Sequence, residues 1–233
     1  MKTICYFLLI ATAFITFSCN SGSSSQSSAD NKDSALSAVC IWDNISLKET
    51  PDEGGKWICS ISIGEVVTYL EETKEDNSGK KPTSYVKVKL KDGKEGWAMA
   101  DFIVLNSKPA AITEDIEIYS RPDLLNKTGK SFIKMDIIAV KSEKDGFIEV
   151  KGKRKGGKWI ESGWLKSKSI SYEAVDIAVA KFAGKALEIS DLKKREEAIN
   201  EILKNSDFKG SIFISSLTSI DSKVEINSAD SLQ

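Results

Sequence analysis

The chain has 233 residues, of which 41% are hydrophobic and 29% charged, with a formal net charge of −1. This composition is typical of globular domains, and so small a net charge gives no general attraction to nucleic acid, which we exclude as a partner. The absence of histidine removes the commonest general base, the usual partner of a nucleophilic serine or cysteine, and the commonest zinc ligand. We therefore expect no enzyme activity, no metal ion and no cofactor; a carboxylate-based glycosidase is the remaining enzymatic alternative.

Residues 1–18 have the features of an export signal. A positive start is followed by the apolar run Ile4 to Phe17, which is too short to span a bilayer comfortably. The end of this stretch resembles a bacterial lipoprotein signal, because the small Ser18 precedes Cys19. The resemblance implies cleavage before Cys19 and a lipid on its side chain, with simple secretion as the alternative. Asn20, in place of aspartate, favours the outer membrane of the cell envelope as the destination.

Residues 19–35 are rich in serine and predict a flexible tether, since they offer too little apolar area to order themselves. Cys40 and Cys59 follow, each inside an apolar run. If these runs form neighbouring strands, a disulfide between them adds about 3 kcal/mol of stability in an oxidising compartment. The alternative is a pair of buried free thiols.

The pattern becomes β after residue 36. Tyr85 to Leu90 alternates apolar and charged residues, as a strand with one buried face does. Lys91 to Lys94 contains Asp-Gly, which predicts a hairpin turn, and Gly96 to Met99 is the expected returning strand. A short turn and a last strand over 100–104 complete the module.

The module occurs twice. Its segments recur in the same order: Ile45 to Pro51 with Ile116 to Pro122, Glu65-Val66-Val67 with Asp136-Ile137-Ile138, and Gly96-Trp97 with Gly163-Trp164. The copies differ in length at two polar loops, Thr73 to Ser84 in the first and Lys151 to Lys158 in the second. Loops that vary while the strands persist are the places where a ligand is most often recognised.

These features resemble bacterial SH3-type domains, which are small β barrels of exported envelope proteins. The resemblance rests on three features: the alternating apolar stretch that precedes Pro51 and Pro122, the Gly64-Glu65 pair, and the Gly-Trp pair that closes each copy. In the second copy, Met135-Asp136 takes the place of Gly64-Glu65 and departs from the family pattern. We expect a mainly β chain with two tandem SH3-like barrels, over 36–106 and 107–169. The resemblance implies binding of peptidoglycan, another envelope polymer or a protein partner. A surface adhesin that binds host proteins is the alternative.

Aromatic residues are the first candidates for a ligand surface, because tryptophan and tyrosine anchor many interfaces. We expect Trp57, Tyr85, Tyr119 and Trp159 to bind the ligand, and Trp97 and Trp164 to pack in the barrels. The five positive charges between Lys151 and Lys158 predict a solvated hairpin, with contact to an anionic surface as the alternative.

Residues 170–233 change to helical periodicity. Val175, Val179, Phe182 and Ala186 predict one helix with Ser171 as its N-cap, and a second amphipathic stretch follows Ser190-Asp191. A short hairpin is expected between 211–214 and 224–226. The two helices of this C-terminal α+β segment are expected to pack on each other or on the second barrel.

Overall fold

The structure, a computed structural model, describes residues 36–219. The predicted signal over 1–18, the tether over 19–35, the lipid site Cys19 and the predicted strand 224–226 lie outside the described residues. Within the described range, none of the helices combines the length and the apolar character needed to cross a membrane.

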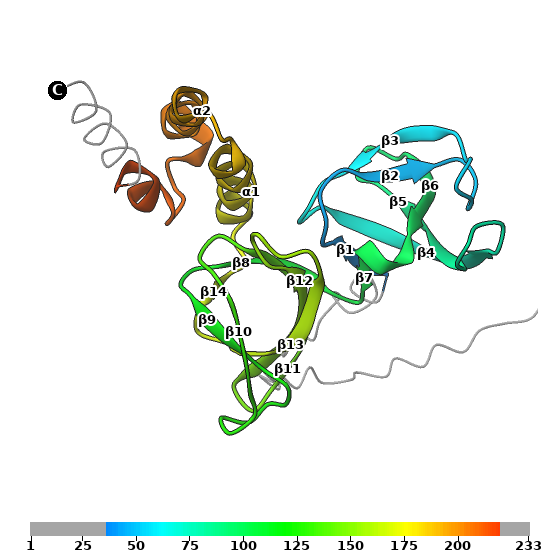
Figure 1. Ribbon diagram of the computed structural model, residues 1–233, viewed down its shortest axis with the longest axis horizontal. Helices are drawn as coiled ribbons and strands as arrows, with labels where there is room; N and C mark the ends of the chain where they lie inside the picture. The colour runs from blue at the N-terminus through cyan, green and yellow to red at the C-terminus, as the bar shows by residue number, and fades with distance from the viewer. Residues whose placement is uncertain (1–35, 220–233) are drawn as a thin grey trace, which may run out of the picture.

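The fold is mainly β: two antiparallel sheets are followed by a helical segment (Figure 1). The strands of the first sheet are β1 (Ser37–Cys40), β2 (Ile45–Lys48), β3 (Trp57–Ile61), β4 (Val66–Asp76), β5 (Thr83–Lys89), β6 (Glu95–Met99) and β7 (Ile103–Leu105), with the 3-10 turn η1 (Ala100–Phe102) before β7. The strands of the second sheet are β8 (Lys108–Ile112), β9 (Ile116–Tyr119), β10 (Lys127–Phe132), β11 (Ile137–Lys144), β12 (Phe147–Lys153), β13 (Ile160–Lys166) and β14 (Ile170–Ser171). The helices are α1 (Ala174–Glu188), α2 (Leu192–Lys204) and the 3-10 turn η2 (Ser206–Phe208).

The sequence repeat is a repeat of topology. The first sheet has the strand order β3-β2-β6-β5-β4-β1-β7 and the second has β10-β9-β13-β12-β11-β8-β14. Each strand of the first order has its counterpart at the same place in the second. Figure 1 shows the second sheet nearly end-on, curving around its interior. Each sheet therefore encloses its own core.

The two cores use corresponding residues. Leu47, Val86 and Ala98 are buried in the first core. Ile118, Ile148 and Leu165 are buried in the second. They come from matching strands, because β2, β5 and β6 correspond to β9, β12 and β13. Apolar residues at these alternating positions face inward, and burying one aliphatic side chain contributes about 1.5–3 kcal/mol.

The two closing glycines are required by close backbone approach. A Cβ on Gly96 would lie 2.6 Å from the carbonyl oxygen of Lys48. A Cβ on Gly163 would lie 2.7 Å from the carbonyl oxygen of Tyr119, which takes the place of Lys48 in the second sheet. The Gly-Trp motif is therefore the point where β6 crosses β2 in the first sheet and where β13 crosses β9 in the second.

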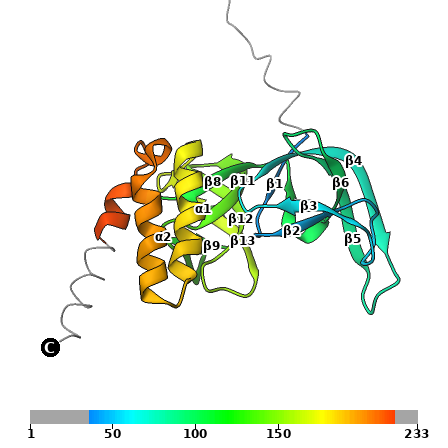
Figure 2. The same cartoon turned by 90° about the horizontal axis from the view of Figure 1, so that it is seen from above.

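Helix α1 holds the three parts together. It packs on β8 and β11 through a core that includes Ala111, Ile137 and Val179. Ile63, in the turn between β3 and β4, packs against the same core. Figure 2 shows α1 between the sheets and α2, so that α2 lies on the far side of α1 from the first sheet.

Both predicted helices are present, but the predicted N-cap of the first is wrong. Helix α1 is capped by Glu173, without a side-chain hydrogen bond. Ser171 belongs to β14, where its Oγ accepts a hydrogen bond from the backbone N–H of Glu173 and donates one to Asp176 Oδ2 at 2.5 Å. The sheet holds Ser171 in an extended backbone, so the helix begins later than the sequence pattern indicated.

The first strand of the predicted C-terminal hairpin is also wrong, since residues 211–213 form a turn that leads into a helix over 214–219. The cause is the buried carboxylate of Asp176, which is 2% exposed. Its Oδ1 accepts hydrogen bonds from Ser211 Oγ at 2.7 Å and from the backbone N–H of Ile212 at 3.0 Å. These bonds fix the turn against the start of α1.

Candidate functional site

One face of the first sheet gathers aromatic and charged residues. Lys48 on β2 is paired in register with Trp57 on β3 and with Trp97 on β6. Trp97 is paired in turn with Lys87 on β5. Residues paired across antiparallel strands lie on the same side of a sheet, so these four side chains form one row. Lys87 Nζ lies 5.9 Å from the centroid of the Trp97 ring.

Tyr85 belongs to the same face. It is paired with Met99, and its chain neighbour Val86 lies in the core, so Tyr85 points away from the core. It is nevertheless only 4% exposed, because two loops fold over this face. These loops join β2 to β3 and β4 to β5. The second of them is the polar loop that differs in length between the two copies.

The two loops and Tyr85 line a pocket whose charged rim includes Lys48, Glu53, Asp76 and Lys81. Lys48 Nζ donates to the carbonyl oxygens of Asp52 at 3.1 Å and Glu53 at 2.6 Å. The backbone N–H of Glu53 donates to Asp76 Oδ2 at 3.1 Å, which ties one loop to the other. The pocket is therefore built by contacts between its own walls.

The rim carries both signs of charge. Hydrogen bonds from Ser78 hold the pKa of the Asp76 carboxyl below its usual value. Burial and the nearby carboxylates of Asp76, Asp52 and Glu53 raise the pKa of the Tyr85 hydroxyl, so that it stays a neutral phenol. Such a site can hold a ligand with an ammonium and a carboxylate against an aromatic floor.

The second sheet fills the corresponding place with aromatic rings. Tyr119 on β9 stands where Lys48 stands in the first sheet, and it is paired with Trp164. The rings of Tyr119 and Phe147 meet edge to face, with centroids 5.5 Å apart. Glu149 is the partner of Trp164 on β12. The two sheets thus share one geometry and differ in the polarity of this face.

The four predicted ligand residues fall into two classes. Trp57 is 60% exposed and Trp159 is 77% exposed, whereas Tyr85 and Tyr119 are 4% exposed each. The structure brings Trp57 and Tyr85 to one face of the first sheet, next to the pocket. It places Tyr119 on β9 of the second sheet and Trp159 in the loop just before β13. Trp97 is buried as expected, and Trp164 is half-buried.

Sequence reasoning missed Lys48, Glu53 and Asp76 as pocket residues. Charged residues in polar loops are usually solvated, so their identity gave no signal. The available signal was the extra length of the loop between β4 and β5, which places Asp76, Gly79 and Lys81 over Tyr85. Over residues 36–219 there is no group of three or more metal-ligating side chains placed to hold an ion.

The predicted disulfide is not formed, because Cys40 and Cys59 are free thiols. Cys40 lies on β1 and Cys59 on β3, and these strands are not neighbours in the sheet order. Burial raises the pKa of the Cys40 thiol to about 12, and burial also raises the pKa of Cys59. Both thiols are therefore protonated at neutral pH.

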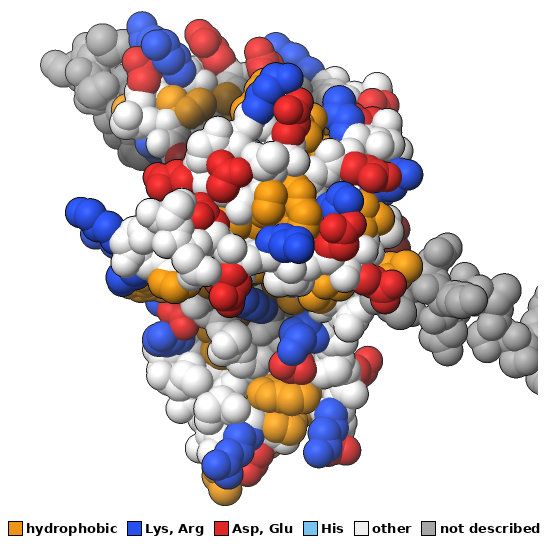
Figure 3. Space-filling view, turned by 90° about the vertical axis from the view of Figure 1, so that its right-hand side faces the viewer, with side chains coloured by type: hydrophobic (Ala, Val, Ile, Leu, Met, Phe, Trp, Pro, Cys, Tyr) orange, Lys and Arg blue, Asp and Glu red, His pale blue; other side chains and the backbone are white. Residues whose placement is uncertain are grey.

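Charges of both signs are interspersed on the face of the molecule that carries the first sheet. Figure 3 shows lysine and arginine side chains alternating there with aspartate and glutamate, with small apolar areas between them. Several of these charges form pairs, including Lys87 with Glu72 at 2.6 Å and Lys89 with Glu95 at 3.1 Å. Recognition on this face therefore depends on local pockets more than on a long-range field.

No family model and no curated protein matches this chain. Among solved structures, it is similar to NlpC2 from Trichomonas vaginalis, at 13% identity and a TM-score of 0.25, over 72% of this chain and 54% of that one. It is similar to NlpC1 from the same organism at 13% identity and a TM-score of 0.25, over 65% of this chain and 52% of that one. The chain spans about half the length of the solved chains it matches.

Both solved structures are named as NlpC proteins, and they do not support the prediction that the chain is not an enzyme. That prediction is withdrawn. It rested on the lack of histidine, which removes histidine-dependent chemistry and leaves carboxylate chemistry open. At this TM-score, the likeness assigns no activity to the chain in its place.

Proposed function

We propose that this chain is a lipid-anchored protein of the bacterial cell envelope that binds peptidoglycan through SH3-type β barrels. The observation that carries the proposal is the Tyr85 pocket, with its aromatic floor and its rim of lysines and carboxylates. Peptidoglycan stem peptides carry free carboxylates and an ammonium group next to a sugar. A pocket of mixed charge beside an exposed tryptophan suits such a ligand.

The identification of both sheets as SH3-type barrels is part of the proposal. It is supported by the shared strand order, by one small core within each sheet and by the Gly-Trp motif at equivalent crossings. A small barrel fills its interior with side chains, which leaves the outer face and the loops to bind a ligand.

The anchor is the second part of the proposal. A lipid on Cys19 and the serine-rich tether over 19–35 would let the barrels reach the wall from the outer membrane, at about 3.5 Å per extended residue. Labelling cells with radioactive palmitate tests this directly. Label should enter the wild-type chain and be absent from Cys19→Ala, and label retained in the variant would refute lipidation at this residue.

Peptidoglycan binding is tested by co-sedimentation of the full chain with purified sacculi. We expect retention at moderate salt and a loss of about tenfold in affinity in Trp57→Ala, as truncation of an anchoring tryptophan usually gives. Leu125→Ala is the matched control, because Leu125 is an exposed apolar residue in the loop between β9 and β10, away from the first sheet. Sacculi whose stem peptides have been removed by an amidase should no longer retain the protein. Equal retention on both kinds of sacculi would refute recognition of the stem peptide.

A further inference from the structure

A cleft of about 130 Å³ opens where both sheets meet α1. Its apolar lining includes Ile63 from the turn between β3 and β4, Ile137 from β11 and Ala180 from α1. Its cations are Lys153, Arg154, Lys155, Lys181 and Lys185, and its carboxylates are Asp43, Asp136 and Glu188. Lys153, Arg154 and Lys155 of the predicted hairpin form one wall of the cleft, and the hairpin is otherwise largely exposed.

Some of these charges already have partners. Lys185 Nζ pairs with Asp43 Oδ2 at 2.9 Å, and Lys153 Nζ lies 4.3 Å from the centroid of the Trp42 ring. Asp136 is 5% exposed, and its carboxylate accepts backbone hydrogen bonds from Ile133 at 2.9 Å and from Lys155 at 3.0 Å. These contacts bind the walls of the cleft together and leave the remaining cations to be explained.

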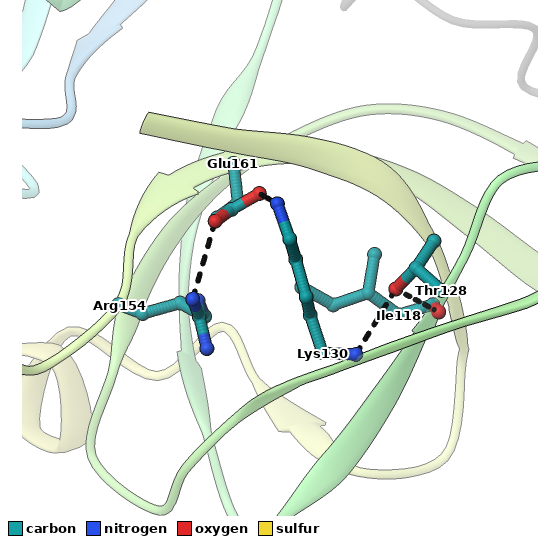
Figure 4. A network of polar contacts seen from close by, with 5 residues as sticks. All are labelled: Ile118, Thr128, Lys130, Arg154 and Glu161. Carbon is teal, nitrogen blue, oxygen red and sulfur yellow. Dashed lines mark hydrogen bonds and ion pairs between the residues drawn. The ribbon is translucent and has the colours of Figure 1, made fainter. Parts of the chain in front are cut away.

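Arg154 has a partner at one nitrogen and none at another. Its Nη2 donates to Glu161 Oε1 at 3.2 Å, and Lys130 Nζ donates to the other oxygen of that carboxylate at 2.7 Å (Figure 4). Arg154 Nε is buried and has no hydrogen-bond partner among the described residues. A buried donor left unpaired costs about 1–3 kcal/mol, so a ligand oxygen that accepted from the Nε–H of Arg154 would be stabilising.

Lys155 and Lys181 are the other two cations of the cleft. Neither forms an ion pair within residues 36–219, although both line the cleft. Lys155 is exposed at the mouth of the cleft, and partial burial lowers the pKa of its ammonium. The nearby carboxylates of Glu188 and Asp136 oppose that effect without closing an ion pair.

We propose that this cleft binds a phosphoryl group, held by Lys155, Lys181 and the Nε–H of Arg154. Lys155 and Lys181 line the cleft without an ion-pair partner among the described residues, and a phosphomonoester carries about −1.5 to −2 charges at neutral pH. Its oxygens supply several strong acceptors, whereas a carboxylate brings one charge and two oxygens. The site lies apart from the Tyr85 pocket and does not depend on peptidoglycan binding.

Isothermal titration of the full chain with inorganic phosphate, glycerol 3-phosphate and acetate tests the proposal. Phosphate or glycerol 3-phosphate should bind and acetate should not, and the tighter of the two ligands identifies a free or an organic phosphate as the source. Lys155→Gln and Lys181→Gln should each weaken binding about tenfold, the loss of one charge-assisted hydrogen bond. Lys158→Gln is the matched control, because it removes the same charge from the same hairpin outside the cleft.

A side-chain ¹H–¹⁵N spectrum supplies the second readout. The Nε–H signal of Arg154, assigned from its loss in Arg154→Lys, should shift on addition of phosphate, while those of Arg121 and Arg195 stay in place. No binding of either phosphate would overturn the proposal. Equal weakening by Lys158→Gln, or acetate binding as tightly as phosphate, would overturn it as well.

Discussion

Gly64 and Met135 occupy corresponding turns of the two sheets, and both have a left-handed backbone, with φ of +76° and +70°. The N–H of each donates at 2.8 Å to a carbonyl oxygen of the strand that opens its sheet. The following residues, Glu65 and Asp136, each accept a hydrogen bond on their carboxylate from an N–H earlier in the same turn. The turn is thus conserved between the copies although methionine replaces glycine.

A left-handed backbone is costly for Met135, because its Cβ approaches the following carbonyl. We expect Met135→Gly to be more stable than Met135→Ala by about 1 kcal/mol, since both remove the side chain and only glycine relieves the strain. Urea denaturation measures the difference. Gly64→Ala should be destabilised, because its Cβ would also lie 3.1 Å from Ile177 Cγ2. An alanine variant as stable as the glycine variant at residue 135 would contradict this account.

Gly96→Ala and Gly163→Ala should each destabilise the fold by about 1–3 kcal/mol, the usual cost of overpacking. The added methyl group would lie 2.6 Å from Lys48 O in the first case and 2.5 Å from Ile118 Cγ2 in the second. Gly184→Ala is the control, because no atom lies within 4 Å of that Cβ and alanine favours the helix. Thermal melting compares the three, and an unchanged midpoint in either sheet variant would show that the crossing is looser than described.

The thiols should react at different rates. Cys40 is fully buried with a pKa raised to about 12, whereas Cys59 is partly exposed. We expect a thiol reagent to modify Cys59 slowly in the native protein and Cys40 only after unfolding. Mass spectrometry of digested samples assigns each modification. If neither cysteine reacts in the native protein, and if a reducing agent makes both reactive, the two residues form the disulfide that the structure lacks.

The link between the first sheet and α1 should weaken in acid. Burial raises the pKa of the Asp43 carboxyl, but the hydrogen bond and charge of Lys185 outweigh it and leave the pKa below its usual value. A carboxyl whose pKa is lower in the folded than in the unfolded state stabilises the fold at pH values above its unfolded-state pKa of about 3.9. This stabilisation is lost as the pH falls through the folded-state pKa. Melting midpoints measured from about pH 6 to pH 3 should therefore fall less steeply in Asp43→Asn. Parallel curves for variant and wild type would contradict the assignment.

The repeat and its elements could be predicted from the sequence because they depend on local patterns. The alternation from Tyr85 to Leu90, the Asp-Gly turn and the helical spacing after residue 173 all specify elements that the structure contains. The predictions were wrong where contacts between residues far apart in the sequence determine the local structure. Ser171 is held in β14, and Asp176 bends residues 211–213 into a turn that their apolar pattern did not indicate.

The pockets could be predicted only in outline. The two loops of unequal length both line cavities, and this could be anticipated from their variation alone. The side chains that meet in each pocket could not be predicted. They depend on how the loops fold over Tyr85 and on how α1 packs against the hairpin between β12 and β13. The free cysteines show the same limit, since two apolar runs can belong to one sheet without being neighbours.

Peptidoglycan binding at the Tyr85 pocket is tested most directly by titrating the full chain with a soluble muropeptide. The titration is monitored through the NMR signals of the tryptophan indole N–H groups. Trp57 and Trp97 lie in the row that borders the Tyr85 pocket, whereas Trp159 and Trp164 belong to the second sheet. The account predicts saturable shifts for Trp57 and Trp97 and none for Trp159 and Trp164. Saturable shifts confined to Trp159 and Trp164, or no shift at any tryptophan, would contradict it.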